Sequence, residues 1–126
     1  MFILSKNVFQ KGYAYAHKSN PEIITNQDWP GVDGTLKTNT VLQYNEDYTK
    51  VEAWGFPALA TAPSKKKRSA KKMPPKPIEC FKLHLGDINP SEKPRLPRNL
   101  DYKKAITDYL SEMGMSNLNK FLCSQC

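Results

Sequence analysis

The segment that decides the fold runs from Gly12 to Pro57 and ends in the sequence Thr40-Val-Leu-Gln-Tyr-Asn-Glu-Asp-Tyr-Thr-Lys-Val-Glu-Ala-Trp-Gly55. Apolar and polar residues alternate in it at strand spacing, and clusters of turn-forming residues interrupt the alternation. The β-branched side chains of residues 22–25 suit a half-buried strand. The pattern predicts an antiparallel meander of about four strands, over residues 13–16, 22–25, 38–44 and 50–54.

The connections between the first strands are predicted from composition. Residues 17–21, His-Lys-Ser-Asn-Pro, make a turn. Residues 26–35 hold glycines, aspartates and Pro30, which is typical of a loop. Trp29 within this loop is either a lid over the core or a surface contact residue. The lid is favoured, because large aromatic side chains contribute most through burial.

Shorter elements complete this half of the chain. Residues 45–49 are predicted to form a hairpin loop, and the carboxylates of Glu46 and Asp47 within it are expected to face solvent. One helical turn is expected over residues 58–62, because a proline lies just before it. Phe2–Leu4 is long enough for one short strand.

The second half of the chain carries the helical signal. Residues 78–85 fit the apolar spacing of both a helix and a strand, so both alternatives stay open. After a proline-containing loop at 86–99, a helix is predicted with Asn99 as its N-cap and Gly114 as the C′ residue that ends it. Residues 115–126 form a tail that either resumes the helix or frays. The apolar face of the predicted helix consists of Tyr102, Ile106, Tyr109, Leu110 and Met113.

The fold class predicted from these elements is α+β, in one domain, because 126 residues are too few for two. Ten prolines weigh against continuous secondary structure, so the core is expected to be small. The chain divides into an N-terminal segment 1–11, a strand-rich core 12–62, a Lys-rich loop 63–77, a helical part of the same domain 78–114 and the tail 115–126.

Positive charge is concentrated in one segment. The formal net charge is +7, from 19 basic and 12 acidic residues. Removing the seven basic residues between Pro63 and Pro77 leaves 12, which the 12 acidic residues balance. Met73 is the one large apolar side chain in this segment, so we expect residues 63–77 to be disordered. The seven basic residues are Lys65, Lys66, Lys67, Arg68, Lys71, Lys72 and Lys76.

The basic run Lys65-Lys-Lys-Arg-Ser-Ala-Lys-Lys72 has three interpretations. It is typical of a nuclear-import signal, or of a patch that binds nucleic acid weakly and non-specifically through phosphates. The third interpretation, a solvated loop insertion, is favoured because no adjacent aromatic residue supplies a stacking platform. A nucleic-acid contact would use Lys65, Lys66, Lys67, Arg68, Lys71 and Lys72.

Few residues point to chemistry on their own. Cys123-Ser-Gln-Cys126 has the spacing of half a zinc site or of a redox motif, but a structural zinc site needs four ligands. The other candidates, Cys80, His17 and His84, lie in different predicted elements, so we interpret the pair as incidental. Neither histidine has a nucleophile or carboxylate at a catalytic spacing. These pieces alone predict no enzyme, no metal site and no bound cofactor.

Neither a signal peptide nor a membrane span is predicted. The apolar opening Met1–Leu4 is shorter than the roughly 7 to 15 residues of a signal-peptide core. No apolar run approaches the ~20 residues that cross a bilayer. We therefore expect a cytoplasmic protein with reduced cysteines and no membrane partner, or a nuclear one if the basic run acts as an import signal.

The order of the predicted elements resembles the N-terminal ATPase domain of the heat shock protein 70 superfamily, in particular its divergent member 12A and 12B type. The resemblance covers roughly residues 12–114. It rests on Gly12-Tyr-Ala-Tyr-Ala16, Pro21-Glu-Ile-Ile-Thr-Asn26, Lys37-Thr-Asn-Thr-Val-Leu42, Val51-Glu-Ala-Trp-Gly55, Phe81-Lys-Leu-His-Leu-Gly86 and Leu100-Asp-Tyr-Lys-Lys-Ala-Ile-Thr-Asp-Tyr-Leu110.

The resemblance implies a partial lobe of an actin-like ATPase, and in the family the cofactors are ATP and magnesium. Family members begin with a strand that ends in Asp-[Leu/Phe]-Gly-Thr-Thr-x-[Ser/Thr]-Gly and holds the nucleotide phosphates. This chain has Ser5-Lys-Asn-Val-Phe-Gln-Lys11 instead, without the aspartate, the glycine or the threonines. Phosphate binding is expected to be lost or crippled, because a phosphate loop depends on closely approaching backbone N–H groups and hydroxyls. Lys82 matches the family's catalytic-site lysine in position.

Three hypotheses follow. The leading one is a truncated, heat shock protein 70-like ATPase-domain fragment without ATP hydrolysis, in which Lys82 remains as a vestigial phosphate-binding or water-orienting residue and a full-length family member is a candidate partner. The second is a small basic adaptor that binds nucleic acid or a nuclear-import receptor through residues 64–76. The third is a chain that does not fold stably, because half a lobe leaves sheet edges and apolar faces uncovered.

Overall fold

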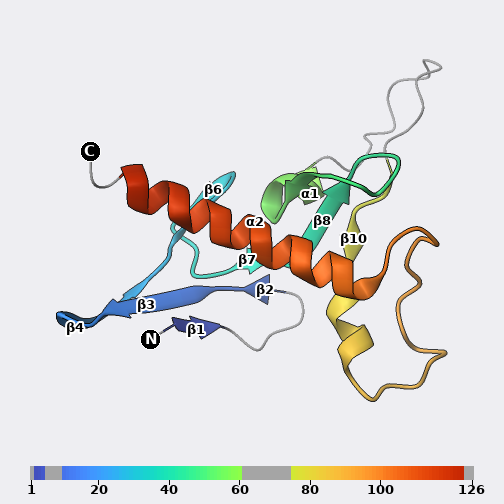
Figure 1. Ribbon diagram of the computed structural model, residues 1–126, viewed down its shortest axis with the longest axis horizontal. Helices are drawn as coiled ribbons and strands as arrows, with labels where there is room; N and C mark the ends of the chain where they lie inside the picture. Colours follow the sequence, from blue (N-terminus) through green and yellow to red (C-terminus); the bar gives the residue numbers. More distant parts are fainter. Residues whose placement is uncertain (1, 5–9, 61–74, 124–126) are drawn as a thin grey trace.

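The computed structural model describes residues 2–4, 10–60 and 75–123, and the side chains of residues 10–60 and 75–119. Within these ranges, short antiparallel strand pairs are crossed by one long helix, α2 (Tyr102–Cys123), which runs in front of them in Figure 1. The α+β class predicted from the sequence is confirmed.

The predicted hairpin of residues 13–25 forms from the third and fourth strands of the chain. β3 (Tyr13–His17) pairs with β4 (Asn20–Thr25) on one side and with β1 (Phe2–Leu4) on the other, both antiparallel. The turn between β3 and β4 is two residues long, shorter than the expected 17–21. The strand predicted for Phe2–Leu4 is confirmed.

Burial of β4 was predicted wrongly. All six of its residues are exposed, and Ile23 and Ile24 expose 55% and 45% of their surface. β4 lies at the edge of its three-stranded sheet, and none of its side chains is covered by another described element. The β-branched pattern therefore identified a strand but not its environment.

The second pair of strands lies in a separate three-stranded sheet, so the single meander of four strands predicted from the sequence is wrong, and the strand predicted over 38–44 is interrupted at Thr40. β8 (Val41–Tyr44) pairs with β9 (Val51–Trp54), and the loop 45–49 connects them. β7 (Thr38–Asn39) comes directly before β8 and pairs with β2 (Gln10–Lys11), which comes directly before β3. This two-residue ladder connects the sheet of the first hairpin to the sheet of the second.

The strand β8 is buried on both faces. All four of its residues are buried, although the alternating sequence predicted that only one face would be. The physical reason is that β8 contacts both α2 and the short helix α1 (Phe56–Ala60), which begins two residues before the predicted turn. The polar Gln43 is accommodated because its Nε2 donates to the carbonyls of Pro75, at 2.7 Å, and Tyr44, at 3.1 Å.

Trp29 is a lid over the core, as the sequence favoured. It lies in β5 (Asp28–Trp29), which forms a two-residue ladder with β6 (Val32–Asp33) inside the predicted loop. Its side chain is 4% exposed, and its Nε1 donates to the Thr35 carbonyl at 2.8 Å. Its ring packs edge-on against Tyr13 and Trp54.

Residues 78–85 combine the two alternatives that the sequence left open. β10 (Ile78–Glu79) adds a strand to β8, and the 3-10 helix η1 (Phe81–Leu85) follows. Cys80 separates them with a left-handed backbone, φ 57°. This abrupt change of direction is why a single periodicity could not describe the segment.

Both ends predicted for the long helix are wrong. α2 begins at Tyr102, and the carbonyl of Asp101 accepts the Ala105 N–H, so Asp101 rather than Asn99 occupies the N-cap position. Gly114 does not end the helix, which continues to Cys123. The buried face is Ala105, Tyr109 and Met113, whereas Leu110 of the predicted face is exposed.

Two predicted segments lie largely outside the described residues. They are the Lys-rich loop, of which residues 75–77 alone are described, and the last three residues of the tail. The disorder expected for residues 63–77 stays a prediction.

Two glycine-to-alanine substitutions should change stability in opposite directions. Gly55 has φ 65°, and a Cβ there would lie 2.6 Å from the hydroxyl oxygen of Thr38. Gly55→Ala should therefore lower the free energy of unfolding by about 2 kcal/mol or more. Gly114→Ala should raise it by about 0.5 to 1 kcal/mol, because a Cβ there meets nothing within 4 Å and alanine favours the helix.

Urea unfolding of the two variants and the unchanged protein measures both effects. If Gly114→Ala destabilised the protein, α2 would not continue through residue 114, and the end predicted from the sequence would be right.

Candidate functional site

Lys82, the one site residue that the sequence suggested, lies where η1 meets α2. Its Nζ lies 5.4 Å from the centre of the Tyr109 ring, within the range of a cation–π interaction. Tyr109 is fully buried, and its hydroxyl donates to the Asn39 carbonyl at 3.1 Å. The amine of Lys82 is thus held against a rigid part of the core.

A second lysine, Lys11, approaches Lys82 from β2. Lys11 is 6% exposed and pairs with Thr38 across the ladder that connects the two sheets. The backbone next to it is packed tightly, because a Cβ at Gly12 would overlap the carbonyl oxygen of Leu36. Lys11 and Lys82 are 71 positions apart, and no local pattern predicts that their side chains lie together.

The surroundings of Lys82 disfavour its charged form. Burial, followed by the charge of Lys11 and by hydrogen bonding with Lys11, lowers the pKa of Lys82 from 10.5 to about 8. Two lysine side chains at one place form a cationic cluster that an anion such as phosphate would stabilise. A lysine with a pKa of about 8 is also a better proton acceptor near neutral pH than an ordinary lysine.

The segment predicted to have lost the phosphate loop is described only at its end. Residues 5–9 lie outside the described ranges, and Gln10 and Lys11 form β2. The structure therefore places Lys82 and Lys11 together but leaves the rest of this segment as a sequence observation.

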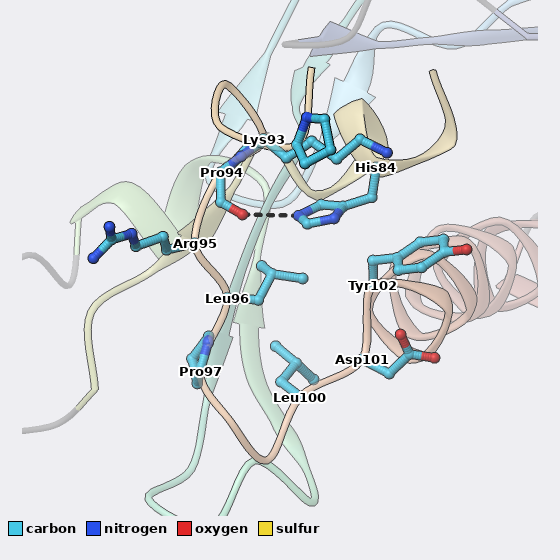
Figure 2. Close-up of a pocket in the computed structure, with 10 residues that line it drawn as sticks. His84, Lys93, Pro94, Arg95, Leu96, Pro97, Leu100, Asp101 and Tyr102 are labelled. Atoms are coloured by element: carbon cyan, nitrogen blue, oxygen red, sulfur yellow. Dashed lines mark hydrogen bonds between the residues drawn. The ribbon is translucent and has the colours of Figure 1, made fainter. Parts of the chain in front are cut away.

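His84 lies at a separate place, on the far side of η1. Its Nε2 is 2.8 Å from the Pro94 carbonyl oxygen, and its ring stacks on Tyr102 at 5.4 Å between ring centres. Together they form part of the wall of a surface pocket of about 500 Å³, shown in Figure 2. His17 is exposed in the turn after β3, where its Nδ1 lies 2.5 Å from the Ser19 hydroxyl. The two histidines lie in different elements, as the sequence indicated.

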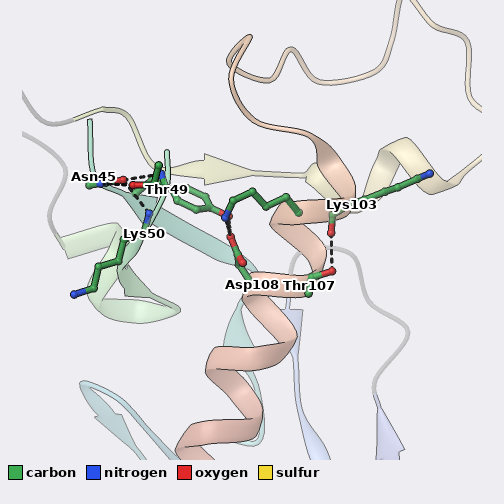
Figure 3. A network of polar contacts seen from close by, with 8 residues as sticks. Asn45, Thr49, Lys50, Lys103, Thr107 and Asp108 are labelled. Atoms are coloured by element: carbon green, nitrogen blue, oxygen red, sulfur yellow. Dashed lines mark hydrogen bonds and ion pairs between the residues drawn. The ribbon is translucent and has the colours of Figure 1, made fainter. Parts of the chain in front are cut away.

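A polar network between β8 and α2 has a structural role. The Tyr44 hydroxyl donates to Asp108 Oδ2 at 2.7 Å, and Lys104 pairs with the same oxygen. Burial and the bond to Asp108 raise the pKa of Tyr44 well above its usual value. The Tyr44 hydroxyl therefore keeps its proton and donates a hydrogen bond to the Asp108 carboxylate. Figure 3 shows this network beside the loop after β8, where the Asn45 side chain accepts the backbone N–H groups of Thr49 and Lys50.

The remaining candidates do not assemble into a site. Glu46 and Asp47 are exposed in the hairpin loop, as predicted. Among the described residues, no group of three or more His, Cys, Asp and Glu side chains gathers at one place. Cys80 is a free cysteine, and burial raises its pKa. The side chain of Cys123 and all of Cys126 lie outside the described residues, so the interpretation of this pair as incidental stays a prediction.

Within the described ranges, no helix combines the length and the apolar character needed to cross a bilayer. The longest one, α2, carries four charged residues in its first half, of which Lys103 is exposed and Lys104, Asp108 and Glu112 are partly buried.

Lys82 should make stability depend on pH between about 8 and 10. The unfolded chain keeps this proton up to the ordinary pKa of 10.5, whereas the folded protein releases it near 8. The unfolded state therefore binds more protons in this interval, and the free energy of unfolding contributed by Lys82 rises with pH. Lys82→Met removes this rise, and the exposed Lys18→Met should leave it unchanged.

The quantity to measure is the difference in unfolding free energy between the unchanged protein and Lys82→Met, from urea titrations at several pH values. The difference is needed because the raised pKa of Cys80 makes the unfolding free energy of both proteins fall as pH rises, and subtraction removes this shared effect. Measurements should stop near pH 10, where Tyr13 and Tyr109, with pKa values raised to about 12, begin to destabilise the fold. A difference that does not change with pH would contradict the placement of Lys82.

Comparisons of this chain with protein-family models, with curated proteins and with solved structures find no match. The resemblance to the heat shock protein 70 superfamily therefore rests on the stretches quoted above. The candidate site rests on the geometry of Lys82, Lys11 and Tyr109.

Proposed function

We propose that residues 12–114 form part of one lobe of an actin-like, heat shock protein 70-type ATPase domain, and that this chain does not hydrolyse ATP. The observation that carries the proposal is the position of Lys82, the residue that matches the family's catalytic-site lysine. Its amine is half-buried against the Tyr109 ring and beside Lys11, as a residue that contacts a phosphate would be.

The exposed apolar residues support a partial lobe. Ile23 and Ile24 on β4, and Leu110, Met115 and Leu118 on α2, are all exposed. A lobe that lacks its neighbouring elements would leave such side chains uncovered, and a full-length family member could cover them.

The residues present do not fit a complex of ATP with magnesium. Two lysines supply positive charge, but phosphoryl transfer also needs a backbone N–H cradle, metal ligands and a residue that positions the attacking water. The segment Ser5–Lys11 has neither glycine nor threonine to form the cradle. No cluster of three metal-binding side chains occurs among the described residues. Lys82 is therefore at most a weak anion contact.

Isothermal titration of the protein with ATP and magnesium tests this proposal. We expect no saturable heat corresponding to a dissociation constant of about 1 mM or tighter. The Lys82→Met variant is the matched control, since any weak residual phosphate contact should be lost in it. Saturable binding at millimolar or better affinity, abolished by Lys82→Met, would overturn the proposed loss of the nucleotide site.

We keep a second proposal because of the charge distribution: a basic adaptor that binds nucleic acid or a nuclear-import receptor through residues 64–76. It is supported by the seven basic residues in that region, outside which the chain has no net charge. Lys76, the member of this group that lies in the described ranges, is exposed.

Deleting residues 64–76 tests the adaptor. The full chain should shift a generic RNA in a gel at low salt, the shift should weaken steeply as salt rises, and the deletion should abolish it. A shift that survives the deletion would exclude this segment as the contact.

A further inference from the structure

The pocket beside His84 has the size of a small-molecule site. Its volume is about 500 Å³, within the roughly 300 to 1,000 Å³ of sites that hold small ligands. One wall is the loop that contains Pro90, Pro94 and Pro97, and the other is formed by His84 and the first residues of α2 (Figure 2). It lies apart from the Lys82 cluster and plays no part in the function proposed above.

The walls of the pocket are held in place without a ligand. The Pro94 carbonyl can only accept, so His84 Nε2 carries a hydrogen and donates it there, which fixes the loop to η1. The stacked ring of Tyr102, at 11° to that of His84, fixes η1 to α2. The turn between Pro97 and Leu100 is closed by a backbone hydrogen bond of 3.0 Å. A preformed pocket needs little ordering when a ligand binds.

The two ends of the pocket differ in charge. The apolar lining in the middle of Figure 2 comes from Leu96, which is partly exposed, and from Leu100, which is 4% exposed and belongs to the core. The side chain of Lys93 extends toward His84 at one end, and the carboxylate of Asp101 lies at the other, beside Tyr102. Arg95 belongs to the same loop, but its guanidinium points away from these residues.

We propose that this pocket binds a small organic acid that carries one carboxylate on an apolar or aromatic body of about one ring. The body would contact Leu96 and Leu100, and the carboxylate would lie at the end where Lys93 and the His84 ring are found. Asp101 would repel a second negative charge at the opposite end, so a singly charged anion fits better than a polyphosphate.

Titration of the isotope-labelled full chain with 3-phenylpropionate, followed by backbone amide NMR, tests the proposal. Saturable shifts should centre on Leu96, Leu100 and Tyr102, with a dissociation constant on the order of 1 mM, which is typical of a ligand of about a dozen atoms. The neutral amide of the same acid should bind about three- to tenfold more weakly.

A pair of variants tests whether the positive charge of Lys93, rather than any positive charge on the loop, contributes to binding. Lys93→Gln should weaken the binding of 3-phenylpropionate about three- to tenfold, whereas Arg95→Gln, which removes the same charge from the same loop, should change it less than about twofold. The proposal is overturned if the shifts do not saturate, if the amide binds as well as the acid, or if the two variants weaken binding equally.

Discussion

The buried ring of Tyr109 holds this structure together, because three other elements, β9, η1 and β7, contact it or its hydroxyl. The ring packs edge-on against Trp54 of β9 at 5.8 Å and at a tilt against Phe81 of η1 at 5.9 Å. Its hydroxyl donates to the Asn39 carbonyl of β7, which ties α2 to the strands. Aromatic contacts of this kind add about 0.5 to 1.5 kcal/mol each to the burial of the rings. In a small core, one residue can thus fix the position of a whole helix.

The packing near Tyr109 also leaves one buried hydroxyl, that of Thr38, without a hydrogen-bond partner among the described residues, which costs roughly 1 to 3 kcal/mol. A Cβ at Gly55 would lie 2.6 Å from this hydroxyl oxygen, so the backbone there leaves no room for a side chain. The cost falls where the two small sheets join, because Thr38 pairs with Lys11 across the ladder of β2 and β7, and the burial of Leu42, Tyr44 and Phe81 offsets it.

The candidate site is a consequence of the same packing. Lys82 follows directly from Phe81, whose burial brings η1 against α2 and places the lysine over the Tyr109 ring. The pairing of β2 with β7 places Lys11 beside Lys82. Two amines that are both removed from water repel each other, and together with burial this lowers the pKa of Lys82. This property depends on side chains that are far apart in the sequence.

The sequence by itself determined the local elements: the hairpins of residues 13–25 and 41–54, the loop around Trp29, the α+β class and Lys82 as a candidate. Alternation, turn residues and aromatic size are local properties, so they can be recognised without the fold. Only the tertiary structure decided which faces are buried, where α2 ends, and that Lys11 and His84 belong to two different sites. β8 is buried on both faces because two helices contact it, and β4 is exposed because no described element covers it. Both outcomes depend on contacts between residues distant in the chain, which local patterns do not contain. α2 continues past Gly114, whose backbone does not adopt the positive φ of a helix-ending glycine.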